Sequence, residues 1–274
     1  MTTLASIGIH PDTTHIGFVD EAYWNERRHR FRSVACVSAK AQDYDEIERR
    51  LCNARCEAGA KISEIKWMEL TDEERRRDAE SVLKAVIEMV AERKVKVDIL
   101  VWGSSQNGVS REKSLQNRYL SMIQTIALRT WHESARVSDV FWSYKIHAPS
   151  DDILQQVKEE WDQRSIVMEQ VPSLDIGRAK SALNYMVQVA DLFAGMSAYS
   201  CEYAREFQNW LDAGQPDEFA TRAASWRNRF PFISKFVDHC QITALDLSSI
   251  DAMWNEFALL TPDEDSEVVV RLFR

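Results

Sequence analysis

The segment from residue 181 to residue 198 restricts the possible folds most, because it combines helical spacing with apolar side chains on nearly every side. Five small or polar residues interrupt it at steps of three or four: Ser181, Asn184, Gln188, Asp191 and Gly195. Residues at such steps share one face of a helix. A helix that is otherwise apolar is buried, so its polar face must meet a partner, a wet cleft or an ion. We therefore expect a buried helix over residues 179–205 that carries part of a site; the alternative is a face satisfied by neighbouring backbone groups.

Strand and helix signals alternate along the rest of the chain. The apolar run at residues 14–22 and the alternating run at 32–38 predict an antiparallel hairpin. Further strands are expected at 95–102, 139–147 and 165–171, and helices at 43–56, 71–90, 115–131 and 149–161. This order predicts an α/β fold with a mixed sheet flanked by helices. We expect one domain over residues 1–205 and a C-terminal helical extension over 206–274, packed on it and ending in a strand-like segment at 268–272.

Charge and hydropathy narrow the classes of function. The chain has 274 residues, 45% of them hydrophobic, and a net charge of −9, which argues against broad affinity for nucleic acid. Candidate basic patches lie at residues 27–32, at 75–77, and around Trp226, with Arg222, Arg227 and Arg229; for each taken singly, a solvated face that balances the acidic surface is the favoured interpretation. The sequence shows no signal peptide and no apolar run of about 18 residues, so a cytoplasmic protein that does not enter the membrane is expected. The oligomeric state is left open.

Two acidic residues end the first apolar run. Asp20 and Glu21 follow Ile16–Val19, and side-chain alternation sends them to opposite faces of a strand. In open α/β sheets, ligands gather at the carboxyl ends of strands, so these carboxylates are candidates for a site. The alternative is that Asp20 begins a turn.

An acid and a base lie two positions apart in the middle of the chain. In an extended segment, Glu64 and Lys66 of the sequence Glu-Ile-Lys-Trp point the same way. Such a pair can hold a metal ion and a scissile phosphate together, and the alternative is an ordinary exposed ion pair.

Taken together, these motifs resemble the bacterial domain-of-unknown-function family DUF3800, which has a ribonuclease H-like fold. The resemblance covers roughly residues 14–200. It rests on Phe-Val-Asp-Glu-Ala at 18–22, on Glu-Ile-Lys-Trp at 64–67, on Ser181, and on Val-Gln-Val-Ala-Asp-Leu-Phe-Ala-Gly at 187–195. The last motif is the most specific. At the first motif the chain departs from the family, because Tyr23 stands where a glycine is usual.

The resemblance implies a carboxylate cluster that binds Mg²⁺ or Mn²⁺ and hydrolyses phosphodiesters. Its expected metal ligands are Asp20, Glu64 and Asp191, with Lys66 as a further catalytic group that stabilises phosphate charge. Glu21, Gln188, Ser181 and Asn184 are expected to orient the substrate or the site. Two-metal hydrolysis, with ions about 4 Å apart, is the mechanism that such a cluster supports. The expected substrate is a nucleic acid or a nucleotide.

Ribonuclease H-like nucleases usually add an acid on the fourth strand, where this chain offers Ser143, Tyr144 and Lys145. Asp151, Asp152 or His147 could take that place, although no histidine is assigned to catalysis from the sequence. Two other hypotheses stay open. A restriction-endonuclease-like fold would use Asp20 with Glu64 and Lys66 but leaves Asp191 unexplained. A non-catalytic or partner-gated component of a bacterial defence or mobile-element system would explain the missing acid.

Overall fold

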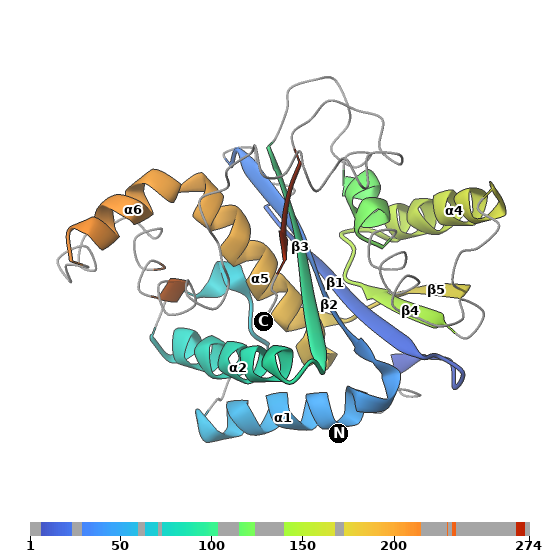
Figure 1. The fold of residues 1–274 in the computed structure, drawn as a ribbon, viewed down its shortest axis with the longest axis horizontal. Helices are drawn as coiled ribbons and strands as arrows, with labels where there is room; N and C mark the ends of the chain where they lie inside the picture. The colour runs from blue at the N-terminus through green and yellow to red at the C-terminus, as the bar shows by residue number, and fades with distance from the viewer. Residues whose placement is uncertain are drawn as a thin grey trace.

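Six strands form one sheet, and helices cover both of its faces (Figure 1). The structure is a computed structural model that describes residues 7–23, 29–59, 64–70, 73–103, 115–123, 140–167, 173–214, 229, 232–233 and 267–271. The strands are β1 His15–Ala22, β2 Phe31–Lys40, β3 Val95–Gly103, β4 Phe141–Ile146, β5 Ser173–Arg178 and β6 Glu267–Arg271. The helices are α1 Tyr44–Glu57, α2 Glu73–Ala91, α4 Asp151–Val167, α5 Tyr185–Glu202 and α6 Ala204–Asp212, and residues 115–123 are also helical.

The strand order β5-β4-β1-β2-β3-β6 gives a ribonuclease H-like mixed sheet. β1 and β2 form the expected antiparallel hairpin, and β3 continues antiparallel to β2. β4 lies parallel to β1 on its other side, and β5 lies parallel to β4. A parallel neighbour requires a crossover connection, which sends the chain over one face between β3 and β4. The predicted fold class is thereby confirmed, and the strand pattern at 268–272 corresponds to β6, which extends the sheet beyond β3.

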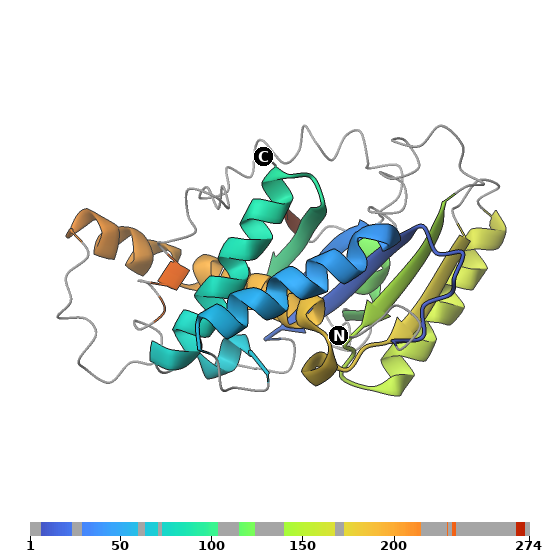
Figure 2. The ribbon, with the colours of Figure 1, turned by 90° about the horizontal axis from the view of Figure 1, so that it is seen from below.

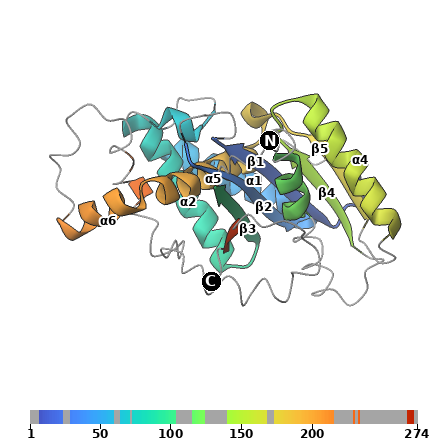
Figure 3. The same ribbon diagram turned by 90° about the horizontal axis from the view of Figure 1, so that it is seen from above.

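Each face of the sheet has its own hydrophobic core. α1, α2 and α5 pack on one face, together with Ile16 and Phe18 of β1. α4 and the helical residues 115–123 cover the other face, together with Val19 of β1. Figure 2 shows α1 and α2 on the same side as α5, and Figure 3 shows α6 leading from the end of α5 away from the sheet. The buried helix expected from its apolar composition is therefore α5, which is enclosed between β1, β2 and α1.

The boundaries of two predicted elements were wrong. α5 begins at Tyr185, because Asn184 is extended and caps it, and Ser181–Leu183 form a separate 3-10 turn. The strand expected at 165–171 lies at Ser173–Arg178, because α4 continues to Val167 with no helix breaker before Pro172. Residues 24–28, 71–72 and 124–131, on which other boundaries depended, lie outside the described residues. The division into two units at residue 205 stays a prediction. In the described part of the chain, no helix combines the length and apolarity that a bilayer crossing requires.

Candidate carboxylate site

Asp20 and Glu21 lie at the carboxyl end of β1 and serve opposite faces of the sheet, as strand alternation predicts. Asp20 is 4% exposed and lies on the side of α5, where its Oδ1 accepts a hydrogen bond from the Glu21 amide at 2.9 Å. The Glu21 carboxylate instead accepts a hydrogen bond from the Tyr119 hydroxyl, which belongs to the core of the other face. Only Asp20 therefore belongs directly to the face that α5 covers.

The polar residues near the start of α5 hold the backbone in place. The Asn184 side chain accepts a hydrogen bond from the Val187 amide at 3.1 Å, which satisfies one of the unpaired donors of the first helical turn. Its amide nitrogen donates to the Tyr44 hydroxyl of α1, also at 3.1 Å. The Ser181 carbonyl accepts a hydrogen bond from Gln188 Nε2 at 2.9 Å. Ser181 and Asn184 thus fix the entrance to α5 and do not share its polar face.

The segment that contains Glu64 and Lys66 is joined to α5 by two hydrogen bonds from its backbone. The Ile65 amide donates to Gln188 Oε1 at 3.0 Å, and the Trp67 amide donates to Asp191 Oδ2 at 2.5 Å. Gln188 is 1% exposed and binds backbone groups at both ends of its amide, so its contacts hold this segment in place. The second and third sequence motifs, 124 residues apart, are therefore in direct contact.

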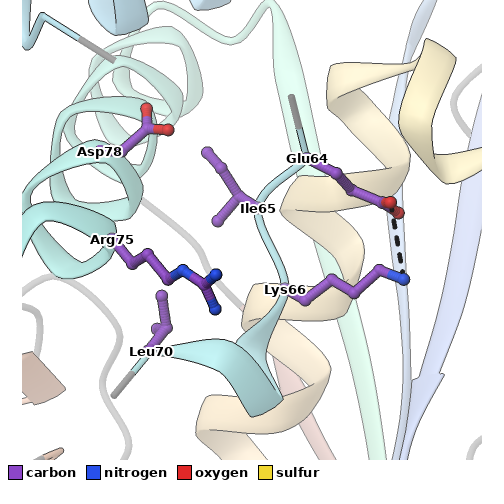
Figure 4. A pocket seen from close by; sticks show the side chains of 6 residues that line it. All are labelled: Glu64, Ile65, Lys66, Leu70, Arg75 and Asp78. Carbon is purple, nitrogen blue, oxygen red and sulfur yellow. Dashed lines mark ion pairs between the residues drawn. The ribbon is translucent and has the colours of Figure 1, made fainter. Parts of the chain in front are cut away.

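Glu64 and Lys66 point the same way, as expected for an extended segment. Figure 4 shows the Glu64 and Lys66 side chains directed away from Asp78 and Arg75, while the Ile65 side chain points toward α2. Lys66 Nζ lies 3.5 Å from Glu64 Oε2, and the Lys66 side chain is 44% exposed. The pair therefore presents a charged group to solvent beside the buried carboxylates of β1 and α5.

Trp67 fits against a position of α5 where only glycine is possible. A Cβ atom added to Gly195 would lie 2.0 Å from Trp67 Cγ, far inside van der Waals contact. The Trp67 indole Nε1 donates to the Tyr23 hydroxyl at 2.5 Å, which joins the same residue to the end of β1. Tyr23 has a positive φ of 62° just after the strand, a backbone conformation that is uncommon for residues other than glycine. Trp67 thus joins its own segment to α5 and to the residue that follows β1.

The carboxyl groups of the site influence one another electrostatically. Burial and the neighbouring Asp191 carboxylate raise the pKa of Asp20 well above its usual value. Burial and the Asp20 charge raise the pKa of Glu21 in the same way. Burial raises the pKa of Asp191 to about 6, opposed by the Trp67 amide and by the positive charges of His147 and Lys66, while Glu64 adds repulsion. Each of these four carboxylates therefore acts on at least one of the others, so their negative charges disfavour one another.

His147, which the sequence offered only as one of three possible substitutes for the fourth-strand acid, lies at the site. β4 pairs with β1 so that Ile146 lies opposite Val19, which places His147 next to Asp20. Its amide donates to the Val19 carbonyl at 2.9 Å, and its Nδ1 lies 3.1 and 3.2 Å from the two Asp20 oxygens. Asp151, which was considered for the same place, forms an ion pair with Arg178, and Asp152 is exposed. The parallel register was the missing information, because it depends on tertiary structure.

The expected basic patches are largely engaged within the protein. Arg229 is 7% exposed, so the expectation that it forms part of a surface patch was wrong; Arg222 and Arg227 lie outside the described residues. Arg30 pairs with Glu202 at 3.4 Å and Arg75 with Glu69 at 2.9 Å. Lys66 lowers the pKa of both Asp20 and Asp191, and His147 lowers that of Asp191.

The donors of the site suit a hard divalent cation in their chemistry. Their ligand atoms are carboxylate oxygens, which Mg²⁺ and Mn²⁺ prefer, and an added cation would offset the repulsion between Asp20 and Asp191. Within the described residues, no three histidine, cysteine, aspartate or glutamate side chains are grouped closely enough to ligate one ion. The site thus has suitable donors but not a complete ligand set.

Comparison with known proteins identifies relatives but no activity. No model of a protein family matches the chain. The chain is similar to a Methanothermobacter thermautotrophicus protein called "Uncharacterized protein ORF2'", with 26% identity over 260 residues that cover 87% of this chain and 88% of the relative. A second protein of that organism, "Uncharacterized protein ORF2", is 25% identical over 242 residues that cover 82% and 83% of the two chains. The function must therefore be argued from the residues of the site.

Proposed function

We propose that the protein is a metal-dependent phosphodiester hydrolase of the DUF3800 type that acts on a nucleic acid or a nucleotide. One observation carries the proposal: three carboxylates that lie far apart in the sequence interact electrostatically, because the charge of Asp191 acts on Asp20 and that of Glu64 acts on Asp191. The charge of Lys66 acts on both aspartates. Purely structural carboxylates are normally buried beside cations that neutralise them, whereas repelling carboxylates are typical of functional sites.

Asp20, Glu64 and Asp191 would hold Mg²⁺ or Mn²⁺, which when bound would activate water and stabilise charge on the leaving oxygen. Lys66 is exposed enough to contact a phosphate and would neutralise part of its charge. His147 contacts Asp20 through Nδ1 and is 40% exposed, so it holds this carboxylate in place beside solvent. Gln188 binds the backbone of the segment that carries Glu64, and Asn184 caps the helix that carries Asp191. Glu21 lies on the opposite face of the sheet, where its carboxylate accepts a hydrogen bond from Tyr119.

The alternative is a non-catalytic or partner-gated component of a defence or mobile-element system. The lack of three grouped ligands among the described residues favours this alternative. The restriction-endonuclease-like hypothesis loses its support, because the strand order is that of a ribonuclease H-like sheet and because Asp191 is a neighbour of Asp20.

The test is calorimetric titration of the full chain with Mn²⁺ and Mg²⁺, followed by cleavage assays on single-stranded, double-stranded and hybrid substrates. We expect Asp191→Asn to weaken Mn²⁺ binding by more than about tenfold and to abolish cleavage. Asp151→Asn is the matched control, because it removes an exposed carboxylate that pairs with Arg178. Wild-type protein that binds neither ion at millimolar concentration and cleaves none of the substrates would refute the hydrolase and support the partner role.

A further inference from the structure

Arg229, from the C-terminal part of the chain, reaches the segment that carries Glu64 and Lys66. Its Nη2 donates to the carbonyl oxygens of Trp67 at 3.2 Å and Met68 at 3.1 Å. The guanidinium carbon lies 4.9 Å from the centre of the Trp67 ring and 5.4 Å from that of Tyr199 on α5. A buried arginine that stacks on two rings and bonds two carbonyls fixes both the side chain and the backbone of its partner.

Trp67 is also the residue whose amide donates to Asp191. The backbone of Trp67 is therefore held on both sides, with its N–H bonded to Asp191 and its C=O bonded to Arg229. Rotation of this residue would break both hydrogen bonds together, because the indole ring is confined by Gly195. The orientation of the Asp191 carboxylate thus depends on Arg229, although Arg229 does not itself contact the carboxylates of the site.

We propose that Arg229 is a positioning residue for the carboxylate site, and that it acts on Asp191 through Trp67. The consequence for metal binding rests on the proposed function, whereas the contact itself does not. Through Arg229, the C-terminal part of the chain controls a site that is otherwise built from residues 20–191. Lysine cannot replace the arginine fully, because an ammonium group lacks the planar guanidinium that stacks on a ring while donating in its own plane.

The experiment measures hydrogen exchange of the Trp67 amide by NMR in the full chain, for wild type, Arg229→Lys and Arg229→Ala. We expect this amide to exchange about tenfold faster in Arg229→Lys, and faster still in Arg229→Ala, because loss of a charge-assisted hydrogen bond releases the segment. The Val37 amide in the β1–β2 hairpin should change much less. Phe232→Leu is the control for packing, since the Phe232 ring lies 6.3 Å from the Trp67 ring and the substitution leaves the Arg229 side chain intact.

Mn²⁺ affinity, measured on the same samples, separates this inference from the proposed function. If the wild type binds Mn²⁺, both Arg229 variants should bind it several-fold more weakly. An equal rise in exchange at Trp67 and Val37, or no rise at Trp67, would overturn the positioning role, and so would unchanged Mn²⁺ affinity in the variants of a wild type that binds Mn²⁺. Selective release of the Trp67 amide in the Arg229 variants, combined with a wild type that binds no Mn²⁺, would support the positioning role and refute the metal-dependent hydrolase. Arg229→Lys decides the question if Arg229→Ala does not fold.

Discussion

Two buried aspartates have very different electrostatic surroundings. Asp78 lies between α1 and α2, and Asp20 lies at the end of β1. Asp78 of α2 is 1% exposed, and Arg55 of α1 donates to both of its oxygens at 3.1 and 2.9 Å. Asp20 is nearly as deeply buried, at 4%, and contacts His147 Nδ1 at 3.1 Å, but burial and the charge of Asp191 raise its pKa well above the usual value. The protein neutralises the first aspartate and leaves the second in a region of excess negative charge.

This difference is the one expected between a structural carboxylate and a carboxylate of the proposed site. A bidentate arginine compensates a carboxylate for the loss of water, so the α1–α2 contact is complete without a ligand. The Asp20 site keeps an unfavourable interaction between carboxylates, which costs stability and which the proposed cation would offset. Stability measurements can therefore distinguish the two regions without knowledge of the substrate.

The largest effect is expected at the neutralised aspartate. Asp78→Asn leaves Arg55 buried without its anion, and we expect the free energy of unfolding to fall by about 3 kcal/mol or more. Urea denaturation followed by circular dichroism measures this change. A loss below about 1 kcal/mol would show that Arg55 finds other partners and would remove the contrast with Asp20.

A smaller effect is expected from pH. The pKa of Asp191 is raised to about 6 by burial, so the folded state binds this proton more tightly than the unfolded state does. Its contribution to stability is present at low pH and is lost as the pH rises through about 6, by up to about 3 kcal/mol in all. The pKa of Glu48, raised by burial to about 7, acts in the same direction.

Urea unfolding at pH 5.5 and pH 8 tests this dependence. In a Glu48→Gln background, which removes the Glu48 contribution, the loss of stability toward pH 8 should become smaller when Asp191→Asn is added. Equal pH dependence of the unfolding free energy with and without Asp191→Asn would mean that the surroundings of Asp191 do not raise its pKa.

The smallest effect, opposite in sign to that of Asp78→Asn, is expected for Asp20→Asn in metal-free protein at pH 8. This substitution removes a charge that burial and Asp191 disfavour, so the free energy of unfolding should rise, by no more than the roughly 1 kcal/mol typical of single substitutions. Addition of Mn²⁺ should stabilise the wild type but not this variant. Destabilisation comparable to that of Asp78→Asn would show that both aspartates are structural.

The fold was predictable wherever a local pattern carries the information. The apolar run that ends at Asp20 and the apolar composition of α5 give two buried elements, and alternation places Asp20 and Glu21 on different faces. The start of α5 was not predictable from periodicity, because Ser181 and Asn184 continue the helical spacing although Asn184 caps the helix. A capping residue marks the end of the helical conformation but leaves the spacing of polar residues in the sequence unchanged.

The contacts between distant segments were less accessible. The contact between Asp20 and His147 depends on the register between β1 and β4, which no local pattern encodes. The site itself was reached through family resemblance, and its chemistry stays a prediction. Trp67 belongs to the Glu-Ile-Lys-Trp motif, but the sequence assigned it no role, because its contacts join it to residues that lie far away in sequence.

Because Gly195 has no side chain and packs against Trp67, the residue that position 195 can accept depends on the residue at position 67. Even a methyl group there would clash with the Trp67 ring and displace the residue whose backbone amide donates to Asp191, so position 195 can enlarge only if position 67 shrinks. A larger residue at position 195 should therefore be tolerated only together with a smaller one at position 67.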